Sequence, residues 1–287
     1  MEVNKITVLG AGLMGHGITQ VAAQIGKYDV TMRDIEQRFI DNGINMIRGS
    51  LQKFVSKGQI TETEMNEVLA RIHTTLDLKQ AVENADLIIE AVPENIELKK
   101  TTFREVDTHA PKHAIIASNT SSVSITELAS ATKRPEKVCG MHFFNPPQLM
   151  KLVEIIKGKQ TNDETIQTIM EVAKKMEKET VLVKKDTPGF IVNRILIPAL
   201  NEAVALHWED VATKEDIDKA IKLGLNWPMG PLMLLDYIGA DTTLAIAEVL
   251  ERELDEKFHP HPGLKQMVKA NLLGRKTGKG FYDWTQK

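Results

Sequence analysis

Residues 5–15 read Lys5-Ile6-Thr7-Val8-Leu9-Gly10-Ala11-Gly12-Leu13-Met14-Gly15, and this stretch decides the fold of the chain. Its first five residues, rich in β-branched and apolar side chains, are typical of a buried strand. Apolar residues at helical spacing follow between Ile18 and Ile25, and Gly26 ends the predicted helix. Residues 28–33 read as a second strand that ends at Asp34. This order of a strand, a glycine-rich turn, a helix and a strand predicts a βαβ unit.

Each glycine of the turn has a separate task in such a unit. Gly10 makes the tight turn, Gly12 lets a pyrophosphate approach the backbone, and Gly15 lets the helix pack closely on the strand. The helix that begins at Leu13 and Met14 offers free N–H groups and the positive end of its dipole to the phosphates. The sequence therefore predicts a dinucleotide site at this turn, with these five residues as its contacts.

An acidic residue follows at the distance that such a site requires. Asp34 lies 24 residues beyond Gly10, at the end of the second strand. Its carboxylate would accept hydrogen bonds from the ribose 2′- and 3′-hydroxyls and repel a 2′-phosphate, which favours NAD over NADP. Arg33 and Arg38 stand nearby, so that appreciable use of NADP stays open.

The composition is that of an ordinary globular protein. The 287 residues can bury a sizeable core and are expected to form two domains. The net charge of −3 gives no indication of a nucleic-acid partner. Cys139 is the single cysteine, which excludes an internal disulfide and suits a reducing compartment. No apolar run approaches the roughly 20 residues of a membrane span, and the first strand begins close to Met1, so we expect a cytoplasmic enzyme without a membrane partner.

The rest of the chain divides into a part with strands and a part without. Further strands are predicted at residues 71–75, 86–92, 114–117, 138–144, 151–156 and 180–183, and residues 36–71 read as helical with a break at Gly58. We therefore expect an α/β fold, with a Rossmann-type doubly wound sheet over residues 1–185 and an all-α domain over residues 186–287. Asp186 or Thr187 is expected to cap the first helix of that domain, with Pro188 in its first turn.

Polar residues follow two of the predicted strands. Glu94 comes just after the strand at 86–92, and the loop at 118–122 (SNTSS) follows the strand at 114–117. Ligands bind at the carboxyl ends of strands in doubly wound sheets. A second reading is that a Ser or Thr of the loop caps the helix that starts near Ile125. Both readings can hold, because a cap uses one hydroxyl.

His142 and Glu154 are the candidates for proton transfer. His142 lies in the strand at 138–144, and Glu154 shares one face of the strand at 151–156 with Leu152 and Ile156. A carboxylate among apolar side chains needs a partner. His142 is near enough to pair with it if the two strands are neighbours, and such a pair in a nucleotide-binding chain favours catalysis over a merely structural histidine.

Two other groups of residues are weaker candidates for a functional role. Ser50, Lys53 and Lys57 fall on one side of the helix in residues 36–71, which by pattern alone favours a solvated face over a patch for the phosphates of an anionic substrate. His259 and His261 have no acid or further histidine at ligand spacing, so no metal site is expected.

The chain resembles the 3-hydroxyacyl-CoA dehydrogenase family over nearly its whole length, most closely the single-function 3-hydroxybutyryl-CoA dehydrogenases of prokaryotes. The motifs that carry the resemblance are residues 10–15 (GAGLMG), 94–95 (EN), 118–122 (SNTSS), 142–146 (HFFNP), 186–194 (DTPGFIVNR) and 276–282 (KTGKGFY). The fourth and fifth are highly specific, and the order and spacing of all six fit the family.

The resemblance implies a role for individual residues. The catalytic base falls on His142, and the glutamate that orients it falls on Glu154. Ser121 and Asn193 correspond to the residues that contact the substrate. The cofactor contacts fall on Asp34, Glu94, Lys99, Ser121 and Asn145. The coenzyme A contacts fall on Ser50 and Lys57, which reverses the preference for a solvated face.

The implied activity is reversible hydride transfer between NAD and C3 of a 3-hydroxyacyl-CoA such as 3-hydroxybutyryl-CoA. The resemblance also suggests a homodimer or a larger homo-oligomer. Two alternatives stay open: a dehydrogenase of the same superfamily that acts on a sugar acid such as gulonate without coenzyme A, and a non-enzymatic, crystallin-like NAD-binding protein. The sequence leaves the acyl-chain length and the direction of the reaction in the cell open.

Overall fold

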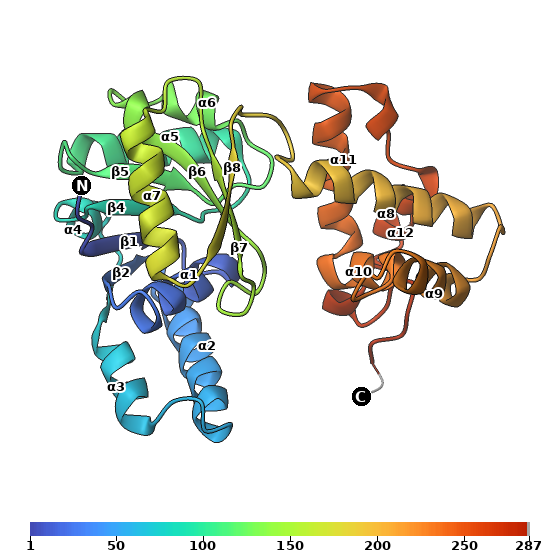
Figure 1. Cartoon of the computed structure of the whole chain (residues 1–287), viewed down its shortest axis with the longest axis horizontal. Coiled ribbons are helices and arrows are strands. Elements are labelled where there is room, and N and C mark those ends of the chain that lie inside the picture. Colours follow the sequence, from blue (N-terminus) through green and yellow to red (C-terminus); the bar gives the residue numbers. More distant parts are fainter. Residues whose placement is uncertain (286–287) are drawn as a thin grey trace. The chain divides into compact units, whose positions relative to one another are not determined.

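The computed structural model describes residues 1–285, in two compact units that comprise Met1–Thr187 and Pro188–Lys287 (Figure 1). Residues 286 and 287, the last two of the predicted helical domain, lie outside the described residues. The first unit contains a sheet with helices, and the second is built of helices.

The first unit has one eight-stranded sheet of order β3-β2-β1-β4-β5-β6-β7-β8. Its strands are β1 (Lys5–Leu9), β2 (Asp29–Arg33), β3 (Ile72–Thr75), β4 (Leu87–Glu90), β5 (Ile115–Ser118), β6 (Val138–Phe143), β7 (Leu152–Ile156) and β8 (Glu179–Val183). Its helices are α1 (Leu13–Gln24), α2 (Gln37–Ser56), α3 (Glu62–Ala70), α4 (Leu78–Val82), α5 (Ile96–His109), α6 (Ile125–Ala129) and α7 (Asp163–Lys175). Neighbouring strands are parallel except β6 and β7, which are antiparallel. The predicted doubly wound α/β fold is confirmed.

The two faces of the sheet are covered by different helices. One face packs against α1 and α7, and Figure 1 shows α7 lying across the strands. The core on this face includes Ile6, Val8, Ile18, Leu87, Ile89, Ala117, Met141, Val153 and Ile169. On the opposite face, Thr7 donates a hydrogen bond to the Ala81 carbonyl of α4, and Gly140 lies against Ile125 of α6. Because side chains alternate along a strand, this second face also carries Glu90, Ser118, His142 and Glu154.

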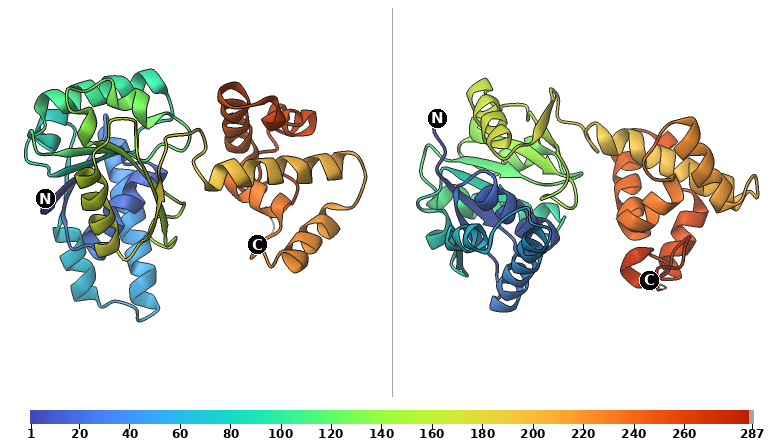
Figure 2. Two further views of the ribbon diagram at one scale, coloured as in Figure 1. Left: turned by 45° about the horizontal axis from the view of Figure 1, so that its top comes forward. Right: turned by 60° about the horizontal axis from the view of Figure 1, so that its bottom comes forward.

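Helices α2 and α3 form a pair that extends beyond the sheet (Figure 2). Gly58 has a φ of +66°, and its N–H donates to Val55 O, which is the left-handed ending common at helix C-termini. The next helix starts with a capping box, in which Thr61 and Glu64 bond each other's backbone N–H groups. The predicted break at Gly58 is confirmed.

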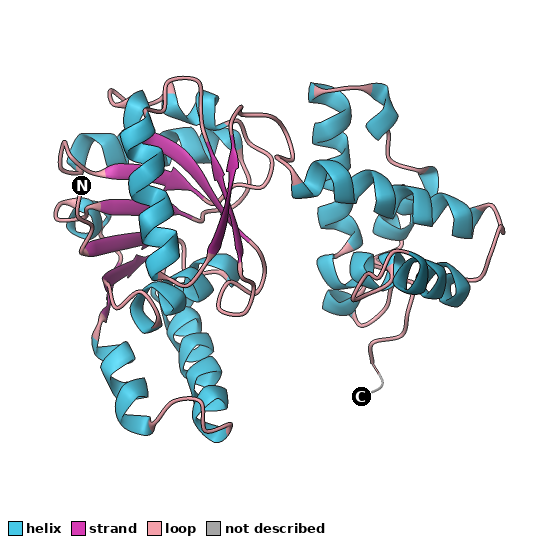
Figure 3. Ribbon diagram, viewed as in Figure 1, coloured by secondary structure: helices cyan, strands magenta, loops and turns pink. Residues whose placement is uncertain are grey.

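The second unit contains α8 (Val192–Trp208), α9 (Lys214–Gly224), α10 (Pro231–Ile238), α11 (Ala240–Glu253) and α12 (Pro262–Lys269). One core cluster of this unit includes Leu200, Val204, Leu232, Leu235 and Leu264. In Figure 3 this unit is drawn as helices and loops, and two isolated β-bridges occur near its C-terminal end. The all-α prediction for this part is confirmed.

The predicted cap of the first helix in this unit is wrong. The helix α8 begins at Val192, after a Gly189 and a Phe190 with positive φ. Asp186 instead accepts hydrogen bonds from Ser124 Oγ at 2.6 Å and from the Thr126 N–H at 2.8 Å. The carboxylate therefore holds the first turn of α6, because that turn leaves N–H groups without intrahelical partners.

Asp86 joins two strands at the amino edge of the sheet. Its replacement tests how much these contacts contribute to the stability of the fold. The carboxylate accepts hydrogen bonds from the N–H groups of Asn4 and Lys5, at 2.8 and 2.9 Å, and lies 3.0 Å from His113 Nε2. Burial alone raises the pKa of Asp86, but these donors outweigh it and leave the pKa below its usual value. A carboxyl group with a lowered folded-state pKa contributes stability above its unfolded pKa and loses it as the pH falls through the folded pKa.

We expect Asp86→Asn to lower the free energy of unfolding by about 1–3 kcal/mol at pH 7, because the N–H groups lose a charged acceptor. Urea unfolding monitored by circular dichroism measures this difference. The difference in the free energy of unfolding between variant and wild type should become smaller as the pH falls below about 4. A gap that stayed constant with pH would contradict the role of the charge.

Candidate functional site

The candidate site lies at the carboxyl edge of the sheet. The parallel strands β1, β4, β5 and β6 end there at Leu9, Glu90, Ser118 and Phe143. Strand β1 stands between β2 on one side and β4 on the other, so the chain reverses its direction of winding at this point. A crevice for a ligand forms outside the strand ends at such a switch point. The glycine turn between β1 and α1 occupies this position.

The geometry of the glycine turn fits a dinucleotide. Gly10 has a φ of +105°, and a Cβ there would lie 2.6 Å from the Ala91 carbonyl oxygen. A Cβ on Gly15 would lie 1.7 Å from the Gly10 carbonyl oxygen, so only glycine lets α1 approach the turn this closely. A Cβ on Gly12, in contrast, would meet nothing within 4 Å. The open space at Gly12, beside the N-terminus of α1, suits the pyrophosphate of NAD.

Gly15→Ala tests this turn. The added methyl group would force the Gly10 carbonyl and the first turn of α1 apart, so we expect the variant to lose measurable NADH binding and to unfold at a lower temperature. Fluorescence titration with NADH measures the binding. Gly49→Ala is the matched control, because a Cβ at this α2 position meets nothing within 4 Å. Equal NADH affinity in both variants would rule out a phosphate site at this turn.

Asp34 is hydrogen-bonded to the same turn. Its Oδ2 accepts from the Ala11 N–H at 2.7 Å, and its Oδ1 accepts from the Ile35 N–H at 2.7 Å. Each carboxylate oxygen can accept a further bond, so both remain available to ribose hydroxyls. The neighbouring cations are engaged elsewhere, since Arg33 Nε donates to the Leu76 carbonyl and Arg38 pairs with Glu36. This arrangement favours NAD, whose ribose carries a hydroxyl where NADP carries a phosphate.

His142 stands between a carboxylate and a hydroxyl. The antiparallel register of β6 and β7 places His142 directly opposite Glu154, and His142 Nδ1 lies 2.8 Å from Glu154 Oε2. On the other side, His142 Nε2 lies 3.1 Å from Ser121 Oγ. The side chains of His142 and Glu154 are 5% and 1% exposed. The predicted contact between the two residues is confirmed.

This arrangement is suited to general acid–base chemistry. When the Nδ1–H group of His142 donates a hydrogen bond to Glu154, the proton stays on Nδ1, and the lone pair of the neutral ring lies on Nε2. The carboxylate also stabilises the imidazolium that forms when Nε2 takes up a proton. Ser121 Oγ marks the position beside Nε2 where an oxygen atom of a substrate can reach.

Glu94 holds the loop that carries Ser121. Its Oε1 accepts from the N–H groups of Ser121 and Ser122, at 2.9 and 3.0 Å, and from Thr120 Oγ1 at 2.5 Å. Its Oε2 lies 3.1 Å from Lys99 Nζ. Burial alone raises the pKa of Glu94, but the Lys99 ammonium and the hydrogen bonds outweigh it and leave the pKa below its usual value. Glu94 is therefore a carboxylate at neutral pH, with 40% of its side chain exposed.

The remaining predicted residues lie in separate parts of the structure. Asn145 is exposed, two residues beyond the end of β6. Ser50 is half-buried in α2, and Lys57 is exposed at the end of that helix. Asn193 is half-buried in the first turn of α8 and belongs to the helical unit.

Glu90 is not among the predicted site residues, and Ser118 and Asn119 are predicted only as members of the polar loop at 118–122. Glu90 and Ser118 are fully buried at the ends of β4 and β5, and Ser118 Oγ donates to Glu90 Oε2 at 2.6 Å. Asn119 Oδ1 accepts from the Phe143 N–H at 2.9 Å and so ties the loop to the end of β6. The sequence signal for Glu90 is an acidic residue inside an otherwise apolar strand. This signal is easily overlooked, because further polar residues follow directly after the strand.

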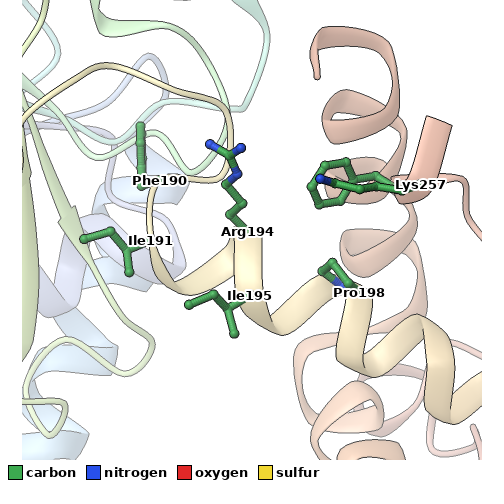
Figure 4. Close-up of a pocket in the computed structure, with 7 residues that line it drawn as sticks. Phe190, Ile191, Arg194, Ile195, Pro198 and Lys257 are labelled. Atoms are coloured by element: carbon green, nitrogen blue, oxygen red, sulfur yellow. The ribbon is translucent and has the colours of Figure 1, made fainter. Parts of the chain in front are cut away.

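The helical unit has a pocket of its own, with a volume of about 520 Å³ (Figure 4). Its lining combines apolar side chains with two cationic ones, and consists of Phe190, Ile191, Arg194, Ile195, Pro198, Lys257 and Phe258. None of the predicted site residues lines this pocket, although Asn193 immediately precedes Arg194.

Residues 1–285 contain neither a cluster of metal-ligating side chains nor a membrane-spanning helix. No group of three or more His, Cys, Asp and Glu side chains in this range could hold a metal ion. None of the helices in this range is both long enough and apolar enough to cross a membrane.

Comparison with known proteins gives a consistent result over the whole chain. Residues 5–187 match the NAD binding domain of 3-hydroxyacyl-CoA dehydrogenase, and residues 189–284 match its C-terminal domain. A probable 3-hydroxybutyryl-CoA dehydrogenase of Bacillus subtilis (strain 168) is 48% identical over 288 residues, covering 100% of this chain and 99% of the relative. The 3-hydroxybutyryl-CoA dehydrogenase of Clostridioides difficile is 47% identical, covering 98% of this chain and 100% of the relative.

A solved structure agrees with these relatives. The crystal structure of (S)-3-hydroxybutyryl-CoA dehydrogenase from Ralstonia eutropha is 42% identical, with a TM-score of 0.94, and the match covers 99% of this chain and 100% of that one.

Proposed function

The chain belongs to the 3-hydroxyacyl-CoA dehydrogenase family, and from this membership we propose that it is an NAD-dependent (S)-3-hydroxybutyryl-CoA dehydrogenase. The reaction is the reversible oxidation of the 3-hydroxyl group of the acyl-CoA to a ketone. The observation that carries the proposal is the position of His142, with Glu154 on one ring nitrogen and Ser121 beside the other, at the carboxyl edge of an NAD-binding sheet.

The acid–base part of the reaction falls to His142. In oxidation, Nε2 takes the proton of the 3-hydroxyl group while C3 loses its hydride. Glu154 holds Nδ1, fixes the tautomer and stabilises the imidazolium that forms. In reduction, the imidazolium gives the proton back to the 3-keto oxygen. Bound NAD supplies the chemistry that the chain lacks, since it accepts and donates the hydride.

The oxygen at C3 also needs hydrogen-bond donors. Ser121 Oγ lies 3.1 Å from His142 Nε2, so it can donate to an oxygen that sits beside this nitrogen. Asn193 is proposed as the second donor, on the basis of the family resemblance. Ser50 and Lys57 are proposed to contact coenzyme A. The proposed cofactor contacts are Asp34, Glu94, Ser121 and Asn145. Lys99, which is buried, is proposed to act on the cofactor through its ion pair with Glu94.

We also propose the division of labour between the domains. The unit Met1–Thr187 is proposed to bind NAD, and the helical unit Pro188–Lys287 is proposed to serve in substrate binding and dimerisation. A homodimer or larger homo-oligomer, in the cytoplasm, is the proposed state of the protein. Sedimentation of the purified chain tests the assembly, and a monomer at micromolar concentration would contradict it.

The proposal is tested by following the oxidation of NADH by acetoacetyl-CoA through its absorbance. Rapid turnover with the thioester, and none with free acetoacetate, is the expected result. Turnover with a sugar acid that needs no coenzyme A would replace the proposal with the gulonate-type reaction. NADH binding without turnover of either substrate would indicate a non-enzymatic NAD-binding protein.

A further inference from the structure

A buried carboxylate that none of the roles above assigns lies behind the site. Glu90 ends β4, and its side chain is completely buried on the sheet face that also carries His142. An ionised carboxylate in such a place persists only when charged and hydrogen-bonding partners surround it. The partners of Glu90 therefore indicate what it does.

All the partners of Glu90 belong to segments that lead into the site. Its Oε1 accepts from Lys99 Nζ at 2.8 Å and from the Val92 N–H at 2.7 Å. Its Oε2 accepts from Ser118 Oγ at 2.6 Å. The Ser118 hydroxyl also accepts from the Thr120 N–H, at 3.1 Å. Glu90 thus connects the segment after β4, the helix α5 and the loop after β5.

Lys99 passes this connection on to Glu94. Its side chain is 1% exposed, and its ammonium group has three acceptors, which are Glu90 Oε1 at 2.8 Å, the Val92 carbonyl at 3.2 Å and Glu94 Oε2 at 3.1 Å. An ammonium group has three N–H donors, so these contacts use all of them. Lys99 therefore acts on a ligand through Glu94.

Glu94 completes the connection to the proton-transfer residue. Its Oε1 holds the N–H groups of Ser121 and Ser122, and Ser121 Oγ lies beside His142 Nε2. A continuous line of contacts thus runs from Glu90 through Lys99 and Glu94 to Ser121 and His142. Two carboxylates share one ammonium along this line.

We propose that Glu90 is a positioning residue, which holds Lys99 so that Lys99 fixes Glu94 and the 120–122 loop for the cofactor and the substrate. The inference rests on the proposed function for the identity of these ligands. Without the charge on Glu90, the Lys99 ammonium keeps one carboxylate partner. It then draws Glu94 inwards, away from the backbone N–H groups of Ser121 and Ser122.

The test compares Glu90→Gln in two backgrounds, the wild type and Lys99→Met. The affinity for NADH is measured by fluorescence titration without acyl-CoA, and kcat and KM are measured with acetoacetyl-CoA. In the wild type, Glu90→Gln should weaken NADH binding by about 10- to 100-fold, the usual effect of losing one hydrogen bond to a charged group. In Lys99→Met, the same substitution should change the affinity by less than about twofold, because the charge of Glu90 is proposed to reach NADH through Lys99 and not through its neutral partners Val92 and Ser118.

Glu97→Gln is the matched control, since it removes a carboxylate from the first turn of α5 whose side chain is 74% exposed. This control should keep the affinity and turnover of the wild type. If Glu90→Gln does not fold, Glu90→Asp keeps the charge but shortens the side chain, and the same comparison of backgrounds applies. Equal losses of affinity in both backgrounds would overturn the proposal, as would a lower melting temperature with unchanged NADH affinity.

Failure of the proposed function would look different. The wild type would bind NADH without turning over acetoacetyl-CoA, and the titration would still show whether Glu90 acts through Lys99. The two results are therefore read from separate measurements.

Discussion

His142→Gln is expected to lower kcat by about 10²- to 10⁴-fold, the usual contribution of a positioned general acid or base. Glutamine fills much of the space of the ring, but its amide cannot take up a proton at neutral pH. The ring is held from both sides, by Glu154 at 2.8 Å and by Ser121 at 3.1 Å. The substitution therefore removes both the proton-transferring group and its fixed orientation.

NADH binding should survive in the same variant, because the glycine turn and Asp34 lie at other strands of the sheet. Two quantities are therefore measured: the turnover of acetoacetyl-CoA, and the affinity for NADH by fluorescence titration. His73→Gln serves as the control, since His73 also pairs with an aspartate but its side chain is 58% exposed on β3. Turnover close to that of the wild type in His142→Gln would remove His142 from the mechanism.

The fold could be predicted because its signals are local. Each strand is a short apolar run, and the glycine turn after β1 has the spacing of a dinucleotide site, so all eight strands were found within a few residues of their observed bounds. Helix α7 carries an equally local signal that the prediction left out. Asn162 caps it, and Ile166, Ile169 and Val172 form its buried face.

Contacts in the candidate site could be predicted from pattern only where the two residues are close in sequence and lie on strands that pair with each other. His142 and Glu154 are twelve residues apart on strands joined by one connection, so period two was enough to bring them together. Ser121 and Glu94 come from different crossovers, and only the pairing of β4 with β5 makes them neighbours. The pattern places both residues after the carboxyl ends of strands, and their individual roles follow from the family resemblance.

Contacts that depend on three-dimensional packing could not be predicted. The capping pattern alone assigned Asp186 to the helix that follows it, but its carboxylate binds Ser124 and Thr126, about 60 residues earlier in the chain. Glu90 lies inside the strand predicted at 86–92 with no role assigned to it, and its burial depends on α5, which contributes Lys99, covering that face of the sheet. Such contacts join distant segments, and no local periodicity encodes them.

Glu154→Gln is expected to lower turnover by about 10²- to 10⁴-fold, although Glu154 touches neither reacting atom in the proposed mechanism. If the new amide oxygen accepts from Nδ1 of His142, the tautomer is kept but the imidazolium loses its charged partner. If the amide NH₂ group donates to Nδ1, the ring proton moves to Nε2 and blocks the lone pair that faces the substrate. Both outcomes slow the reaction, because His142 has to cycle between its neutral and charged forms.

The pH dependence separates this role from a simple packing defect. In the reduction of acetoacetyl-CoA the imidazolium is the proton donor, so the variant should need a lower pH than the wild type to reach half of its maximal rate. Glu179→Gln, the same change at an exposed position on β8, should leave the profile of the wild type unchanged. A profile of Glu154→Gln that coincides with that of the wild type would mean that the buried carboxylate supports the fold alone, and that the charge on His142 is stabilised elsewhere.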